Sequence, residues 1–303
     1  MSKPAIDLHL HSYYSDGAES PETIVARAKA QGYKAIALTD HDGVNGVPEF
    51  LKAAQKAGLK GIPGIELSAY YSMPNPFNPI GTSRRYYMHI LGYGIDPNNK
   101  QLLRILEKIQ AQRSERNEKM RQWLVDHGIP MTDAELTPYS REGYIGKMSF
   151  ARLMVDRGMY PDVETAVADK ELLGNSSFRA IRREKIDAGR AIDAIKSAGG
   201  LAFVAHPYQI TYDGWKMDSP ASYTVNQEMV ISALTAEGLD GLECYYSDHT
   251  AAQSAAALDL AKYLNILVSR GSDDHGENMR PVKKMSKFAA EPDPRLLSWI
   301  DKL

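Results

Sequence analysis

The chain has 303 residues, of which 43% are hydrophobic and 24% charged, as is ordinary for a folded globular protein. Its net charge of −2 gives no broad positive field, so the composition argues against partners such as a long nucleic acid or an anionic membrane. Because the single cysteine, Cys244, excludes an internal disulfide, and because no apolar leader or stretch of transmembrane length is present, we expect a cytoplasmic protein.

The first 98 residues alternate between strand and helix patterns. The first strand places His9 and His11 on one face, because side chains two residues apart share a face. Ser20 and Pro21 form a typical helix start. In chain order we predict a strand over 6–11, a helix over 21–32, a strand over 35–42 that ends in polar residues, a helix over 48–58, a strand over 61–67, a loop over 71–85 that is rich in proline, and a strand over 88–95.

The middle of the chain has a different pattern. From Leu102 to Leu124, apolar residues recur near helical spacing among many charges. We therefore predict a helical insertion over 99–188, set within a domain made of residues 1–98 and 189–303. After the insertion the alternation returns, with helices ending at Gly199, Gly238 and about Tyr263, and with strands over 201–205, 241–246 and 266–269.

Alternating strands and helices predict an α/β fold with a parallel sheet. About seven strand–helix units, with polar residues at each strand end, indicate a closed TIM-like barrel. In such barrels the site lies where the carboxyl ends of the strands meet.

Metal-binding residue types gather at these strand ends. Six of the eight histidines lie there, together with several carboxylates. Mixed imidazole and carboxylate ligands fit Zn, Mn or Fe, and the absence of thiolates argues against a structural zinc. Since the candidates exceed the needs of one ion, we expect two or three divalent ions. The candidate ligands are His9, His11, Asp16, His41, Glu66, His89, His206, Asp273 and His275.

Six separated motifs carry these residues: D-L-H-L-H-S-x-x-S-D-G, T-D-H-D, G-I-E-L, H-I-L-G-Y, A-H-P and G-S-D-D-H. In this order and over nearly the whole chain outside the insertion, they resemble the polymerase and histidinol phosphatase (PHP) family of metal-dependent phosphoesterases. The resemblance implies a distorted (β/α)7 barrel with a dinuclear or trinuclear centre. It assigns His9, His11, Glu66 and Asp273 to a first ion, Glu66, His89 and His206 to a second, and Asp16, His41 and His275 to a third.

Clustered divalent ions suit hydrolysis of phosphate esters, with a metal-activated hydroxide attacking phosphorus. Asp40 is expected to orient a ligand histidine. Asp40 and His249 are the two candidates for protonating the leaving oxygen. His249 directly precedes a predicted helix, and helix N-termini attract phosphate, so we also expect it to contact the substrate.

Within the insertion, the segment G-K-x-x-F-A-R contains Lys147 and Arg152. It is similar to a segment with which small phosphoesterases of the family cover their site. We expect Lys147, Arg152 and Arg179 to contact a second phosphate. The resemblance thus implies a small phosphorylated substrate, above all a nucleotide such as a nucleoside 3′,5′-bisphosphate.

Three other functions fit parts of the sequence. Histidinol-phosphate phosphatase is one, although the insertion argues against it. An exonuclease or phosphodiesterase acting on oligonucleotide ends is another, although the neutral charge gives no groove for a long strand. A non-catalytic metal-binding module is the third, and the complete set of ligands argues against it. The sequence predicts no oligomeric state.

Overall fold

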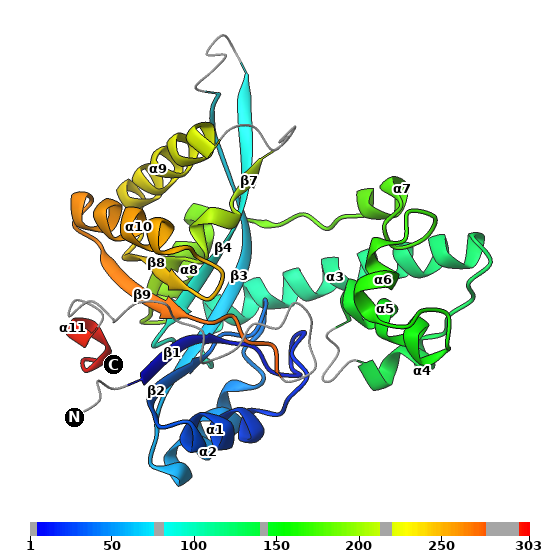
Figure 1. The fold of residues 1–303 in the computed structure, drawn as a ribbon, viewed down its shortest axis with the longest axis horizontal. Coiled ribbons are helices and arrows are strands. Elements are labelled where there is room, and N and C mark those ends of the chain that lie inside the picture. The colour runs from blue at the N-terminus through cyan, green and yellow to red at the C-terminus, as the bar shows by residue number, and fades with distance from the viewer. Residues whose placement is uncertain (1–4, 76–81, 140–144, 213–219, 277–296) are drawn as a thin grey trace.

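The computed structural model describes residues 5–75, 82–139, 145–212, 220–276 and 297–303. Its strands curl into a nearly closed barrel with helices outside, and a lobe of short helices stands apart at the far end of the long helix α3 (Figure 1). Among the described residues, no helix is long and apolar enough to cross a membrane. The helices are α1 (Pro21–Ala30), α2 (Val47–Ala57), α3 (Lys100–Asp126), α4 (Asp133–Leu136), α5 (Lys147–Asp156), α6 (Val163–Ala168), α7 (Ser176–Ala180), α8 (Ala188–Ser197), α9 (Pro220–Ala236), α10 (Ala251–Tyr263) and α11 (Leu297–Ile300).

The barrel follows the strand order β1-β2-β3-β4-β6-β8-β9, with β5 paired to β3 and β7 to β4. It closes just beyond β9, where the amide of His11 donates to Asp274 O at 2.9 Å and the amide of Asp273 donates to His9 O at 2.9 Å. The predicted barrel is therefore confirmed. The strands are β1 (Ala5–Leu10), β2 (Tyr33–Leu38), β3 (Lys60–Pro74), β4 (Ser83–Tyr93), β5 (Ile186–Asp187), β6 (Leu201–Val204), β7 (Thr211–Tyr212), β8 (Gly241–Tyr246) and β9 (Leu267–Gly271).

The prediction of an all-parallel sheet is wrong at one strand. β4 runs antiparallel to both β3 and β6. This reversal has a consequence for the site. A parallel strand reaches the functional edge with its carboxyl end, whereas β4 runs the other way and passes this edge near its middle, at His89. His89 therefore lies opposite Ser68 of β3.

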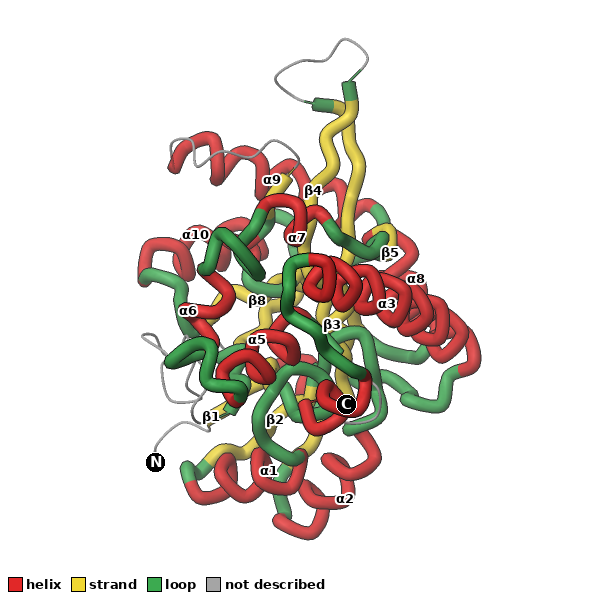
Figure 2. The backbone as a smooth tube through the Cα atoms, turned by 90° about the vertical axis from the view of Figure 1, so that its right-hand side faces the viewer, coloured by secondary structure: helices red, strands yellow, loops and turns green. Residues whose placement is uncertain are grey.

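The loop predicted over 71–85 is also wrong at both of its ends. β3 continues to Pro74 and β4 begins at Ser83, so the two strands form one long antiparallel ribbon (Figures 1 and 2). The prolines suggested a loop, but tyrosine pairs such as Tyr70–Tyr87 face each other across the ribbon and favour strand pairing. Residues 76–81 lie outside the described part of the chain.

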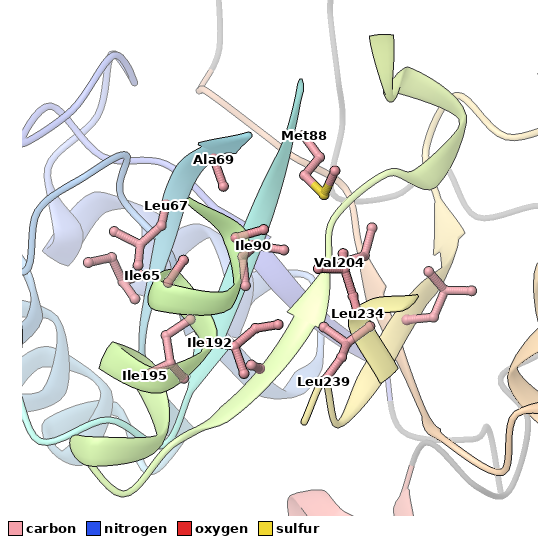
Figure 3. Packing of buried hydrophobic residues seen from close by; sticks show 14 of the residues in the cluster. Ile65, Leu67, Ala69, Met88, Ile90, Ile192, Ile195, Val204, Leu234 and Leu239 are labelled. Carbon is pink, nitrogen blue, oxygen red and sulfur yellow. The ribbon is translucent and has the colours of Figure 1, made fainter. Parts of the chain in front are cut away.

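The main hydrophobic core lies between the barrel and the helices around it. Ile65, Leu67 and Ala69 of β3 and Met88 and Ile90 of β4 face α8 and α9 (Figure 3). Alternate residues of β3 and β4 thus face this apolar layer, and the residues between them face the site.

A second hydrophobic cluster belongs to the lobe of short helices. It contains Met120, Leu124, Phe150 and Phe178, whereas Leu102 of the same long helix packs with the barrel. The 27 residues of α3 span about 40 Å, so this helix connects two separate cores. The division into a barrel and an insertion at residues 99 and 188 stays a prediction.

Candidate metal centre

All nine candidate ligands converge at one edge of the barrel. The carboxylate of Glu66 on β3 lies at the middle of the group and is fully buried. Its oxygens lie 3.0–3.3 Å from a ring nitrogen of each of five histidines: His9, His11, His41, His89 and His206.

The ligand atoms form three groups, within each of which they lie within 4.8 Å of one another. His11 and His41 each belong to two groups, as does Glu66. His206 lies beside them, with Nε2 at 3.1 Å from Glu66 Oε1 and 3.3 Å from His89 Nδ1. The groups are His9, His11, Glu66 and Asp273; His11, Asp16, His41 and His275; and His41, Glu66 and His89.

The donor atoms suit divalent cations. His9 Nε2, His11 Nε2, His41 Nδ1, Asp16 Oδ1 and Glu66 Oε2 are buried and, although they lie 3.0–3.3 Å from one another or from His275 Nε2, they form no well-aligned hydrogen bond with the described residues. Leaving so many polar atoms unsatisfied would be costly, because a buried donor or acceptor normally finds a partner. Bound cations would satisfy all five atoms at once, so the residues present fit a cluster of ions.

Glu243 holds two of the ligands in place, and the sequence analysis missed it. Its Oε1 lies 2.9 Å from His9 Nδ1, and its Oε2 accepts a hydrogen bond of 2.6 Å from the amide of His206. This contact leaves His9 Nε2 to face the cluster. A carboxylate in the middle of an otherwise apolar, buried strand (Gly241–Tyr246) was the available signal.

Asp40 accepts hydrogen bonds from two serines beside the candidate ligands. It accepts hydrogen bonds from the Ser12 amide (2.8 Å), the Ser12 hydroxyl (2.7 Å) and the Ser15 hydroxyl (2.6 Å). Ser15 Oγ in turn lies 3.5 Å from His11 Nδ1. Burial raises the pKa of Asp40 above its ordinary value. The expectation that Asp40 orients a ligand histidine has this geometry in its favour, through the serine.

Asp42, which follows His41, forms a buried ion cluster that the sequence analysis also missed. It pairs with Arg113 of α3 at 2.5 Å and with Arg183, which follows α7. It also accepts from the Ser68 amide at 3.0 Å. Burial opposes ionisation, but Arg183 and Arg113 outweigh it and hold the pKa of Asp42 below its usual value. Asp42 thus connects the turn after β2, which carries the candidate ligand His41, to α3 and to the segment after α7.

Three strand ends at the centre have unusual backbone angles. Asp42, His206 and Asp273 have φ values of 52°, 23° and 57°. Residues other than glycine adopt such angles at a cost of about 1–3 kcal/mol, and they persist where the surrounding contacts over-determine them. The turns after β2, β6 and β9 are therefore shaped to aim side chains at the centre.

A cavity of about 570 Å³ opens beside the centre. Its walls combine three candidate ligands with several cationic side chains and two tyrosines. It is lined by Asp16, His41, Asp42, Ser68, Tyr70, Arg85, Tyr87, His89, Arg113, Arg116, Ile181, Arg182, Arg183, Glu184, Lys185 and Thr211.

The residues predicted to contact substrate are not among these lining residues. Arg152 donates to Asp16 O at 2.8 Å, so it contacts the turn that carries the candidate ligand Asp16. Burial and, to a smaller extent, the charge of Arg179 lower the pKa of Lys147. His249 packs against Tyr246, whose hydroxyl donates to Asp273 at 2.9 Å. The roles of these residues stay predictions.

Sequence comparison finds relatives that match almost the whole chain. The chain is 30% identical over 270 residues to a 5′-3′ exoribonuclease of Haemophilus influenzae. This alignment covers 89% of each of the two proteins. The chain is also 30% identical over 280 residues to a 3′,5′-nucleoside bisphosphate phosphatase of Chromobacterium violaceum, with 91% of this chain and 90% of that protein covered.

Comparison with solved structures finds similar folds that cover almost the whole chain. A solved structure from Bifidobacterium adolescentis, assigned as a metal-dependent phosphoesterase, superposes with a TM-score of 0.74 at 28% identity. The match covers 92% of this chain and 90% of that one. The barrel, the ligand cluster and these relatives define a metal-dependent phosphoesterase. A model of the PHP domain matches residues 7–169, more than half of the chain, so the protein belongs to the PHP family.

Proposed function

We propose that the protein hydrolyses a phosphate ester of a nucleotide, such as a nucleoside 3′,5′-bisphosphate, with two or three Mn, Fe or Zn ions held by the nine converging ligands. The observation that carries this proposal is the cavity beside the centre, which has ligand residues on one wall and cations on another. Its volume of about 570 Å³ falls within the range of small-ligand sites, about 300–1,000 Å³.

When bound, the ions would lower the pKa of water and polarise the phosphoryl oxygens. Hydrolysis forms a bond from the water oxygen to phosphorus and breaks the bond from phosphorus to the ester oxygen. The protein supplies orientation: Glu243 and Asp40 hold ligand histidines, and Glu66 lies between the ligand groups.

A second phosphate on the substrate would bind the cationic wall of the cavity, which contains Arg116 and Arg182. Arg116 and Arg182 face the same cavity as His41 and His89. Guanidinium groups suit phosphate because they donate two parallel hydrogen bonds. A nucleotide with two phosphates would therefore be held at both ends, one at the ligand cluster and one at the arginines.

The relatives support a nucleotide substrate. One is named a 3′,5′-nucleoside bisphosphate phosphatase and another a 5′-3′ exoribonuclease, and the two are equally similar to this chain at 30% identity. Both names refer to enzymes that hydrolyse phosphate esters of nucleotides. Histidinol phosphate, in contrast, carries one phosphate and would place no second phosphate at Arg116 and Arg182.

The test is a phosphate-release assay of the Mn-reconstituted protein. We expect adenosine 3′,5′-bisphosphate to be hydrolysed at least about tenfold more efficiently than AMP, sugar phosphates or histidinol phosphate, because one extra charged contact is worth about 1.5–3 kcal/mol. Release of phosphate from none of these monoesters would overturn the proposal.

Two variants then locate the second phosphate. If the cavity residues bind it, Arg182→Gln raises KM for the bisphosphate about tenfold, whereas Arg179→Gln has little effect. The reverse result would favour the contacts predicted from the sequence. Circular dichroism of both variants checks that the lobe stays folded.

A further inference from the structure

The ribbon formed by β3 and β4 extends well past the rest of the barrel (Figures 1 and 2). Its pairing runs without interruption from Gly64 and Tyr93, inside the barrel, to Pro74 and Ser83 near the tip. The extension starts at the candidate metal centre, since Glu66 and His89 lie on these two strands.

The register divides the ribbon into two faces. Directly opposite residues share a face, and so do residues two apart on one strand. One face carries Leu67, Ala69, Met88 and Ile90, and it packs on the hydrophobic core (Figure 3).

The other face carries three successive cross-strand pairs, which lead outward from the candidate ligand His89. The pair Ser68–His89 is followed by Tyr70–Tyr87 and then by Ser72–Arg85. Burial alternates accordingly along β4, with Tyr86 and Met88 buried while Arg85 is exposed and Tyr87 is half-buried.

Two cations lie over the tyrosines of this face. The Arg85 guanidinium lies 4.4 Å from the centre of the Tyr70 ring, and the Lys185 ammonium lies 5.3 Å from that of Tyr87. Within the described part of the chain, neither cation lies within 4.0 Å of a carboxylate oxygen, whereas neighbouring Arg113 and Arg183 pair with Asp42. The charges of Arg85 and Lys185 can therefore bind an anionic ligand.

We propose that this face, formed by Tyr70, Ser72, Arg85, Tyr87 and Lys185, is a track that binds a short single-stranded oligonucleotide. The proposal rests on the proposed function, because the metal centre would take one phosphate of the same strand. The track binds the nucleotides that follow that phosphate.

Aromatic rings and unpaired cations are the chemistry that single strands require. Bases stack on tyrosine whatever their sequence, and arginine and lysine attract the phosphates. All members of the track except Ser72 line the same cavity as the ligands Asp16, His41 and His89, so the path from the centre is continuous.

The length of the track indicates several nucleotides. Arg85 lies four residues from His89 on β4, which corresponds to about 14 Å at 3.4 Å per residue. A stacked strand advances about 3.4 Å per nucleotide, so the track matches about four nucleotides. The net charge of −2 favours a short ligand over a long one, since the whole molecule offers no broad positive field.

Binding is tested on the metal-loaded protein with a fluorescent, 5′-phosphorylated hexaribonucleotide that has phosphorothioate links to slow its cleavage. Fluorescence anisotropy gives the affinity at several salt concentrations. We expect Arg85→Gln to weaken binding about tenfold and to reduce the salt slope by about 0.7, the value for one lost phosphate contact on a single strand.

Arg84→Gln is the matched control, because Arg84 is the next residue of the same strand and lies on the opposite face, over Tyr212. It should bind the hexanucleotide as the wild type does. Tyr87→Ala should weaken binding about tenfold, and Tyr87→Phe should keep most of the affinity because the ring still stacks.

A second measurement separates this proposal from the proposed function. We expect Arg85→Gln to lower the ratio of kcat/KM for an unmodified hexaribonucleotide to that for adenosine 3′,5′-bisphosphate about tenfold. If the bisphosphate is hydrolysed but Arg85→Gln and Arg84→Gln bind the hexanucleotide equally, the track is wrong and the proposed function stands. If no nucleotide is hydrolysed while only Arg85→Gln weakens binding, the track stands and the proposed function fails.

Discussion

At the residue scale, the centre depends on groups that hold the ligands as well as on the ligands themselves. Glu243 connects His9 on β1 to the backbone of His206 after β6. A single carboxylate therefore positions two ligands that are far apart in the sequence. Losing it should weaken metal binding without removing any ligand.

We expect Glu243→Gln to lower metal affinity about 10–100-fold, the usual effect of removing a group that orients a ligand. The measurement is a titration of the metal-free protein with Mn²⁺. Glu237→Gln is the control, since Glu237 contacts Tyr71 on the outside of the barrel. Equal affinities of the two variants would contradict the role of Glu243.

Gly271 allows the last strand to approach the first. A Cβ atom at this position would lie 2.1 Å from His9 Cβ and 2.4 Å from Glu243 Oε1. We expect Gly271→Ala to displace His9 and to lose at least one ion, measured as metal content per chain. Gly58→Ala serves as the control: Gly58 has a φ of 62° with open space around it, so its substitution should cost about 1–2 kcal/mol of stability and keep the metal. Full metal retention by Gly271→Ala would contradict this reading.

At the element scale, the buried cluster around Asp42 connects the barrel to the helical lobe. Arg113 belongs to α3 and Arg183 follows α7, so the chain leaving the barrel and the chain returning to it meet at one carboxylate. The lobe is thereby held next to His41.

Asp42→Asn would remove the negative charge that the buried guanidinium groups of Arg113 and Arg183 share, and asparagine tolerates the positive φ at this position. We expect a loss of about 3–5 kcal/mol in the free energy of unfolding, measured with denaturant. Ser68→Ala, which removes only a hydroxyl bonded to the same carboxylate, should cost about 1 kcal/mol. Similar small losses in both variants would show that the cluster contributes little.

At the scale of the whole molecule, bound ions and the fold should stabilise each other. The candidate ligands come from β1 and the turn after it, from β3 and β4, and from the segments after β2, β6 and β9, and the unfolded chain does not hold them together. Ligands that bind only the folded state stabilise it by mass action.

We expect Mn²⁺ at a hundredfold excess over its Kd to add about 2.7 kcal/mol per ion to the free energy of unfolding. Thermal unfolding with and without a chelator measures this change. The same comparison with Glu66→Gln should give a much smaller shift, because this carboxylate lies at the middle of the ligand groups. An unchanged melting temperature on chelation would contradict a metal-stabilised barrel.

Because the lobe of short helices has its own hydrophobic core, we expect that a substitution there can destabilise the lobe without destabilising the barrel. Phe178 is buried and packs edge-on against Trp123, with ring centres 5.2 Å apart. We expect Phe178→Ala to shift the fluorescence of Trp123 and to cost about 3–5 kcal/mol locally, while the barrel keeps its metal. Phe203→Ala, in the barrel beside Trp299, is the matched control and should lose metal. Loss of metal in both variants would indicate one cooperative unit.

The sequence by itself determined the barrel and the candidate ligands. Strand periodicity placed His9 and His11 together, and residues at strand ends meet because parallel strands share a carboxyl edge. These are local patterns, so they can be read without coordinates. Only the tertiary structure decided the reversed direction of β4, the ribbon in place of a loop, and the roles of Glu243 and Asp42. Each of these depends on contacts between distant segments, such as a carboxylate on β8 reaching a histidine on β1, and no local pattern encodes such a contact.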